Sequence, residues 1–111
     1  MSPDHKPLVW LIELPKSPPL SIEARIEVGF MLRMLQSGMK LSMPHSRPMP
    51  SIGKACHELR INDEKSTWRF FYRIDNDAIV IVNWDIKKTE KTTKSMIDVC
   101  KRRLSEYDSI L

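Results

Sequence analysis

The stretch ACHELRINDEKSTWRFFYRIDNDAIVIVNW, residues 55–84, decides the fold because it has the pattern of three consecutive strands. Residues 55–61 and 67–74 alternate side chains with the two-residue period of a half-buried strand. Residues 78–84 are almost entirely apolar, as in a strand at the centre of a sheet. The connections NDEKS and DND are made of residues that favour turns. The stretch therefore predicts an antiparallel meander.

Arginines occupy strand positions in this meander, where a charged side chain is costly to bury. Alternation places Arg60 on one face of the first strand, and it places Arg69 and Arg73 together on one face of the second. If the strands pair in sequence order, Arg60 and Arg69 lie on adjacent strands. Their presence can serve solubility, a salt bridge to Glu58 or Asp85, or an anionic partner.

Both flanks of the meander predict further regular elements. LVWLIEL, residues 8–14, is a short apolar run that predicts a strand, and the proline-rich PKSPP ends it. Residues 21–37 predict a helix that Ser21 caps and whose apolar residues recur at helical spacing. These residues are Ile22, Ile26 and Phe30, with Val28, Met31, Leu32 and Leu35 beside them.

The remaining segments are a long loop and a second helix. Residues 39–54 hold three prolines and a glycine without any period, which predicts an irregular loop. The last helix begins after a cap at Thr92 or Thr93. Its apolar stripe is Met96, Cys100, Leu104, Tyr107 and Leu111.

The order of these elements predicts an α+β fold. We expect a small antiparallel sheet, made of the three-strand meander plus an N-terminal strand, with the helices packed on one face. The 111 residues suggest a single domain over 1–111, with a loose N-terminal end at 1–7. Two cysteines without a CxxC motif indicate buried thiols in a reducing compartment. No segment has the apolar length of a signal or a membrane span, so we expect a cytoplasmic protein without a membrane partner.

Positive charge gathers near the end of the chain. Residues 87–103 contain seven lysines and arginines and two acids, a local net charge of +5, whereas the whole chain carries +4. Lys87 and Lys88 follow directly on the third strand of the meander, near the predicted positions of Arg60 and Arg69. Arginine forks fit phosphate groups, and exposed aromatic rings stack on unpaired bases. A solvated charged face is the competing interpretation of the lysine run.

Several enzyme classes lack their motifs here. The chain contains no GxSxG, HExxH or P-loop sequence. Its acidic residues are scattered among bases, whereas a metal-dependent nuclease clusters carboxylates around Mg²⁺. We therefore expect no metal and no cofactor, and any phosphodiester cleavage would rely on basic side chains.

The segments HELRI, WRFFYRID and AIVIVNWDIKKTEKTTKSMIDVCKRRLSEY resemble the HigB-like, phage-derived branch of the RelE/ParE toxin superfamily over about residues 45–107. The resemblance implies a RelE-like fold and a type II toxin that inhibits translation. Such a toxin is an endoribonuclease that cuts mRNA on the translating ribosome. Its implied partners are mRNA, the ribosome and a cognate antitoxin, usually a HigA-like helix-turn-helix protein.

The resemblance also assigns residues. Arg60 matches the arginine of the ELR motif, Arg69 that of WRxxY, and Lys87 and Lys88 the lysine pair, so these four are the implied catalytic set. Asp85 departs from the family pattern and places a negative charge near the lysines. The basic and aromatic residues expected to bind RNA are Arg47, Lys54, His57, Phe71, Arg73, Lys91 and Lys94.

Two alternatives remain open at this point. One is a non-catalytic ParE-like toxin that binds a protein target such as DNA gyrase, because one fold serves both activities. The other is a plain RNA- or DNA-binding module, which would show salt-dependent binding without toxicity.

Overall fold

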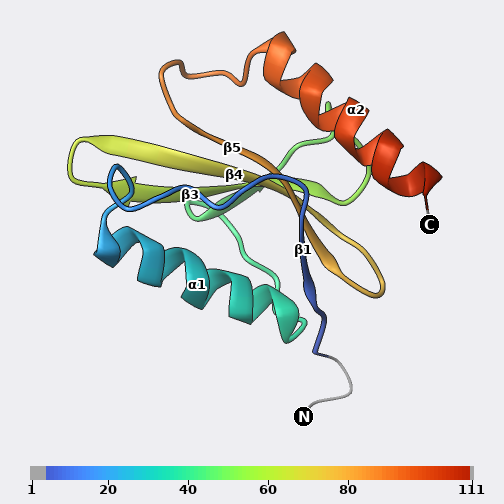
Figure 1. Cartoon of the computed structure of the whole chain (residues 1–111), viewed down its shortest axis with the longest axis horizontal. Coiled ribbons are helices and arrows are strands. Elements are labelled where there is room, and N and C mark those ends of the chain that lie inside the picture. The colour runs from blue at the N-terminus through green and yellow to red at the C-terminus, as the bar shows by residue number, and fades with distance from the viewer. Residues whose placement is uncertain (1–4, 111) are drawn as a thin grey trace.

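The computed structural model describes residues 5–110, which form a five-stranded sheet with one helix against each face (Figure 1). The two strands at the edges of the sheet are the short ones. The first strand of the chain pairs parallel with its neighbour, and all other pairs are antiparallel. This confirms the predicted α+β class. In order across the sheet the strands are β1 (Leu8–Trp10), β5 (Ile79–Ile86), β4 (Ser66–Ile74), β3 (Cys56–Asp63) and β2 (Ser46–Pro48), and the helices are α1 (Ile22–Gln36) and α2 (Lys94–Ser109).

The meander has the predicted pairing of β3, β4 and β5. Arg60 lies directly opposite Arg69 across β3 and β4, and Arg69 lies opposite Asp85 across β4 and β5. A bulge interrupts the second pairing between Phe71 and Tyr72. The three charged side chains therefore share one face of the sheet.

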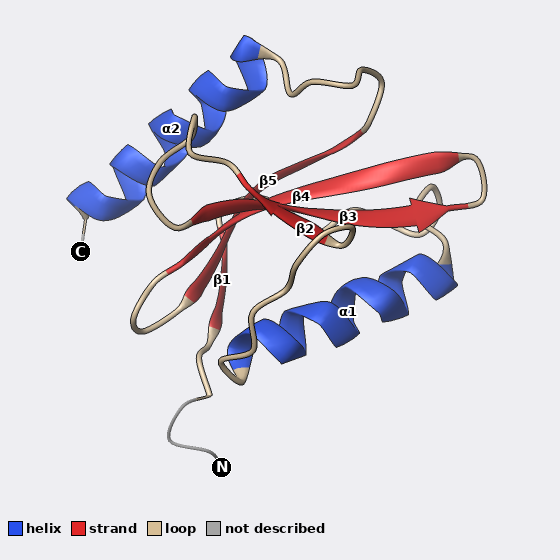
Figure 2. Cartoon of the chain, turned by 180° about the vertical axis from the view of Figure 1, so that it is seen from behind, coloured by secondary structure: helices blue, strands red, loops and turns tan. Residues whose placement is uncertain are grey.

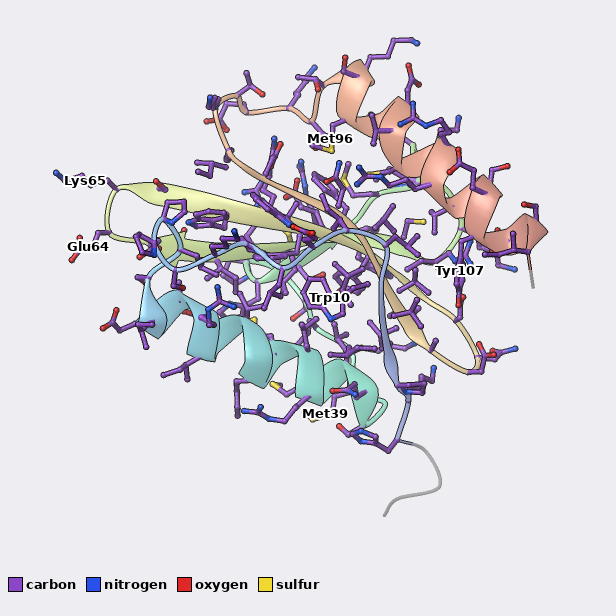
Figure 3. The ribbon with its side chains drawn as sticks, viewed as in Figure 1. Trp10, Met39, Glu64, Lys65, Met96 and Tyr107 are labelled. Carbon is purple, nitrogen blue, oxygen red and sulfur yellow. The ribbon has the colours of Figure 1, made fainter. Side chains whose placement is uncertain are left out.

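The two helices pack on opposite faces, so the prediction that both lie on one face is wrong (Figure 2). Strand β4 explains the difference, because Phe70 faces the α1 side and Phe71 faces the α2 side, and both side chains are fully buried. A strand that is apolar on both sides needs cover on both sides. Figure 3 shows Trp10 on the α1 side of the sheet. It shows Met96 and Tyr107 on the side of α2 that faces the sheet.

Helix α1 buries a different side from the one that its first residues suggest. Its N-cap is Ser21, whose hydroxyl accepts a hydrogen bond from the Ala24 backbone. The core side consists of Ala24, Val28, Met31, Leu32 and Leu35. By contrast, Ile22, Ile26 and Phe30 are 59%, 64% and 56% exposed. Apolar residues occur on two sides of this helix, and periodicity alone does not say which side meets the sheet.

Helix α2 starts at the predicted cap, Thr93, and buries Cys100 and Leu104. Tyr107 packs against the same cluster, while Leu111 lies outside the described residues. Burial raises the pKa of the Cys100 thiol to about 12 and that of Cys56 to about 11. Both thiols are therefore protonated at neutral pH. No helix among residues 5–110 has the length and hydropathy needed to cross a bilayer.

Three boundaries differ from expectation. Strand β1 ends at Trp10 instead of residue 14, and residues 39–54 contain the short edge strand β2, which ends at a proline that an edge position tolerates. In the predicted loose end, residues 1–4 lie outside the described residues. Lys6 and Pro7 are bonded into the fold, because the Lys6 N–H donates to the Gln36 carbonyl and the Pro7 carbonyl accepts from Ile79.

An ion pair anchors α2 to the sheet. Arg73 Nη2 donates to Asp108 Oδ1 at 2.7 Å and to Asp75 Oδ2 at 3.0 Å. The guanidinium holds the pKa of Asp108 below its ordinary value of 3.8. Because the folded-state pKa is depressed, these bonds stabilise the fold above about pH 4, and the stabilisation is lost as the pH falls through the folded-state pKa.

We predict that Asp108→Asn lowers the free energy of unfolding at about pH 7, and that its difference from the unmodified chain shrinks towards zero as the pH falls through the folded-state pKa of Asp108, which lies below the ordinary value of 3.8. Urea unfolding at several pH values measures this difference. Glu106→Gln is the matched control, because Glu106 is largely exposed and its contact with Arg102 is 3.9 Å. A difference that stays constant from neutral to acid pH would contradict the assignment.

Candidate functional site

The part of the α2-side face that α2 leaves uncovered carries an arginine–carboxylate cluster, made of Arg47, Glu58, Arg60, Arg69 and Asp85. Its centre is Glu58, whose side chain is 0% exposed. Glu58 Oε1 accepts from Arg60 Nε at 2.6 Å and from Arg47 Nε at 3.2 Å. A buried carboxylate is stable only when charged or polar donors surround it, and the arginines supply them.

Arg69 is bonded within this cluster through two of its three side-chain nitrogens, while its buried Nη1 lies 3.9 Å from Glu58 Oε2 without a hydrogen-bond partner among the described residues. Its Nε and Nη2 donate to the two carboxylate oxygens of Asp85 at 2.8 and 2.6 Å. These bonds raise the pKa of Arg69 above its ordinary value. The side chain is 3% exposed, and its guanidinium carbon lies 5.7 Å from the centre of the Phe71 ring. Arg69 is therefore placed as a structural ion pair, which is the salt-bridge alternative raised from the sequence.

The same geometry explains Asp85, which departs from the family pattern. Its carboxylate contacts Arg69, whereas the ion pair of Lys87 within the described chain is with Glu90, at 3.7 Å. Asp85 thus neutralises the buried Arg69 and forms no ion pair with Lys87.

Arg60 differs from Arg69 in that its unpaired donors reach solvent. Of its side-chain nitrogens only Nε hydrogen bonds to another described residue, and its side chain is 24% exposed. It lines a pocket of about 310 Å³, here called the Arg60 pocket, together with Lys87 and His45. The other lining residues are Glu27, Pro44, Asn62 and Thr67.

Lys88 lines a second pocket of about 430 Å³, here called the Lys88 pocket, whose other charged residues are Arg69 and Asp85. The four residues predicted to converge thus divide into two pairs, Arg60 with Lys87 and Arg69 with Lys88. Consecutive residues at the end of an extended strand point in different directions, which separates the two lysines. Thr89, Thr93, Trp84 and Ile86 complete the lining of the Lys88 pocket.

Three of the residues expected to bind RNA are placed away from these pockets. His57 lies on the α1-side face and stacks on Tyr72, with ring centres 5.2 Å apart. Arg73 makes the ion pairs that anchor α2, and Lys54 lines a third pocket beside Arg73. Phe71 faces the correct side but is completely buried, so its ring has no free surface for a base.

The other three lie near the pockets. Arg47 belongs to the cluster through Glu58. Lys91 is exposed in the connection between β5 and α2, and Lys94 is exposed at the first turn of α2, where it pairs with Asp98. Lys88, Lys91 and Lys94 together form a basic rim that runs along the connection from β5 to the start of α2.

His45 lines the Arg60 pocket, although the sequence favours an ordinary surface or turn histidine at this position. It precedes β2 in the proline-rich loop, and its carbonyl accepts from the Arg60 backbone at 2.8 Å. The pairing of β2 with β3 therefore brings His45 to Arg60, and no periodicity in the loop signals this. Among residues 5–110, no group of three or more His, Cys, Asp and Glu side chains is arranged to hold a metal ion.

A family model described as Phage derived protein Gp49-like (DUF891) matches residues 10–105. The chain belongs to this Gp49-like family. The match spans both pockets, the whole of α1 and α2 as far as residue 105, and it confirms the phage-derived part of the resemblance found in the sequence. Neither the curated proteins nor the solved structures gave a match.

Proposed function

We propose that this Gp49-like protein is the toxin of a type II toxin–antitoxin system, a HigB-like endoribonuclease that cuts mRNA on the translating ribosome and so inhibits translation. The observation that carries the proposal is the Arg60 pocket, in which an arginine with free donors, a lysine and a histidine meet. These are the groups that bind a phosphodiester and move a proton without a metal.

In this proposal Arg60 and Lys87 bind the scissile phosphate. Glu58 holds the Nε of Arg60 at 2.6 Å, which fixes the plane of the guanidinium and leaves both terminal nitrogens for the phosphate oxygens. Lys87 adds a point charge from the end of β5, on the far side of β4 from Arg60. Buried Arg69 acts in this scheme as a positioning residue, because it holds Asp85 and so the end of β5 in place.

Cleavage then follows the usual path of a metal-free ribonuclease step. The 2′-oxygen loses its proton to His45 and bonds to phosphorus, the bond between phosphorus and the 5′-oxygen breaks, and the departing 5′-oxygen takes a proton from water. Arg60 and Lys87 stabilise the negative charge that grows on the phosphate oxygens. The products are a 2′,3′-cyclic phosphate and a 5′-hydroxyl.

The basic rim extends the RNA path from the pockets along the connection to α2. Lys88, Lys91 and Lys94 contact neighbouring phosphates in this proposal, which gives affinity without sequence preference. The partner that silences the toxin is a cognate antitoxin, for which a HigA-like helix-turn-helix protein is the proposed class. The ribosome and mRNA place the activity in the cytoplasm.

Induced expression in bacteria tests the function. We expect growth arrest within minutes and fragmented transcripts, with cleavage confined to translated reading frames. Arrest with a DNA-damage response and intact transcripts would favour the gyrase-binding alternative. Salt-dependent RNA binding without growth arrest would favour a plain binding module.

We predict that His45→Ala lowers the rate of transcript cleavage by about 100- to 10,000-fold, because general base catalysis contributes a factor of that size. His57→Ala is the matched control, since His57 lies on the opposite face of the sheet and should leave the rate near that of the unmodified chain. Quantitative primer extension on one reporter transcript measures both. Equal cleavage rates for the two variants would show that His45 is not the general base.

A further inference from the structure

Helix α1 has a second apolar side that no other part of the described chain covers. Ile22, Ile26 and Phe30, here called the outer stripe, are spaced four residues apart and are more than half exposed. At 100° per residue the stripe points away from the sheet, opposite to Val28 and Leu32 of the core. Scattered exposed apolar residues need no explanation, but a continuous stripe on one helix is the pattern of an interaction surface.

The surroundings of the stripe favour another helix as its occupant. Gly29 lies beside it, and a Cβ added there would meet only the Arg33 guanidinium, at 3.7 Å. The missing side chain lets a second backbone come close, as small residues do at helix crossings. The two termini of α1 differ in charge, because Glu23 is in the first turn and Arg33 in the last.

We propose that the outer stripe pairs antiparallel with α1 of a second copy of this chain, which makes a two-fold symmetric dimer. If the axis passes at the level of residue 28, Ile26 faces Phe30 of the other copy, and Ile22 faces Met34. At the same time Glu23 comes level with Arg33 of the other copy. One rotation therefore matches apolar with apolar and acid with base, as a self-complementary interface requires.

The charges favour a second copy over a parallel arrangement or an unrelated helix. Parallel pairing would set Glu23 against Glu23 and Arg33 against Arg33, which is repulsive. Within residues 5–110 neither Glu23 nor Arg33 has an ion-pair partner, so both are available to the other copy.

The expected interface is small. The 15 residues of α1 extend over roughly 22 Å, and one helix pair lies at the low end of specific interfaces, so we expect dissociation in the micromolar range. The surface does not overlap the Lys88 pocket, to which α1 contributes no residue. Helix α1 does contribute Glu27, the neighbour of Ile26, to the Arg60 pocket, so the dimer surface lies close to the proposed cleavage site. Sedimentation measures the dimer without reference to cleavage.

Sedimentation velocity on the purified full chain, from low to high micromolar concentration, tests the dimer. We expect the mass to rise from 13.0 kDa towards twice that value. Ile26→Asp should stay monomeric throughout, while circular dichroism shows it folded, because Ile26 lies outside the core. Ile110→Asp is the matched control at another exposed isoleucine and should dimerise normally. A chain that is monomeric at all concentrations, or an Ile26→Asp variant that dimerises, would overturn the proposal.

A charge exchange tests the antiparallel register. Glu23→Lys and Arg33→Glu should each weaken the dimer by roughly three- to tenfold, as expected for exposed ion pairs that occur twice. The double variant restores opposite charges across the axis and should recover most of the affinity. Failure of the double variant to recover would show that the stripe binds something other than α1 of a second copy.

Discussion

Replacing Lys87 with alanine is expected to lower the rate of transcript cleavage by about 100- to 1,000-fold, which is the usual effect of removing one stabilising group from a developing oxyanion. The expected structural cost is small. Its backbone N–H still donates to the Thr67 carbonyl, and its ion pair is a 3.7 Å contact with Glu90, which is 97% exposed. Primer extension on a translated reporter measures the loss, and thermal unfolding checks that the fold is intact.

Lys65→Ala is the matched control for this substitution. Lys65 is exposed at the tip of the β3–β4 hairpin (Figure 3), and it lines neither pocket. Its variant should cut at the rate of the unmodified chain. If Lys87→Ala also cuts at that rate while Lys88→Ala does not, the phosphate binds in the Lys88 pocket and the Arg60 pocket is excluded as the cleavage site.

Arg69→Ala cannot serve the same purpose. That change removes a buried guanidinium and leaves Asp85 without its partner, so a loss of activity would not separate chemistry from folding. Arg60 and Lys87 are the more informative positions because their side chains reach solvent.

Glu58→Gln is expected to destabilise the fold by about 3–5 kcal/mol, the typical cost of breaking a buried ion pair at one partner. The carboxylate is completely buried, and Arg47, Arg60 and Arg69 all lie within 4 Å of it. Glutamine keeps the shape but removes the charge that holds the three cations together. Urea unfolding gives the free energy directly.

Glu90→Gln is the control for this second prediction, because Glu90 is exposed and its change should alter the free energy of unfolding by less than about 0.5 kcal/mol. A loss at Glu58 no larger than that of the control would mean that the carboxylate is not what stabilises the three arginines at close range.

The strands of the meander and both helix caps could be predicted because each has a local cause. The two-residue alternation fixes which side chains share a face, and this brought Arg60 opposite Arg69. Ser21 and Thr93 were recognisable as caps because their side chains bond to the backbone of the next turn.

What the sequence left open depends on contacts between distant segments. Helix α1 carries apolar residues on two sides, and only the packed sheet decides that Val28 and not Ile26 is buried. His45 reaches the Arg60 pocket because β2 pairs with β3, and the proline-rich sequence of residues 39–54 does not predict this pairing. The burial of Glu58 could not be predicted either, because it depends on three arginines that lie on three different strands.

The chemical identity of the fragment ends tests the central claim most directly. A translated reporter transcript is incubated with ribosomes and the purified chain, and the 5′ ends of the fragments are assayed for phosphorylation by polynucleotide kinase without prior phosphatase treatment. Cleavage at the Arg60 pocket predicts 5′-hydroxyl ends, which the kinase labels directly, and 2′,3′-cyclic phosphate at the other ends. Fragments with 5′-phosphate ends, or a transcript that stays intact, would contradict it.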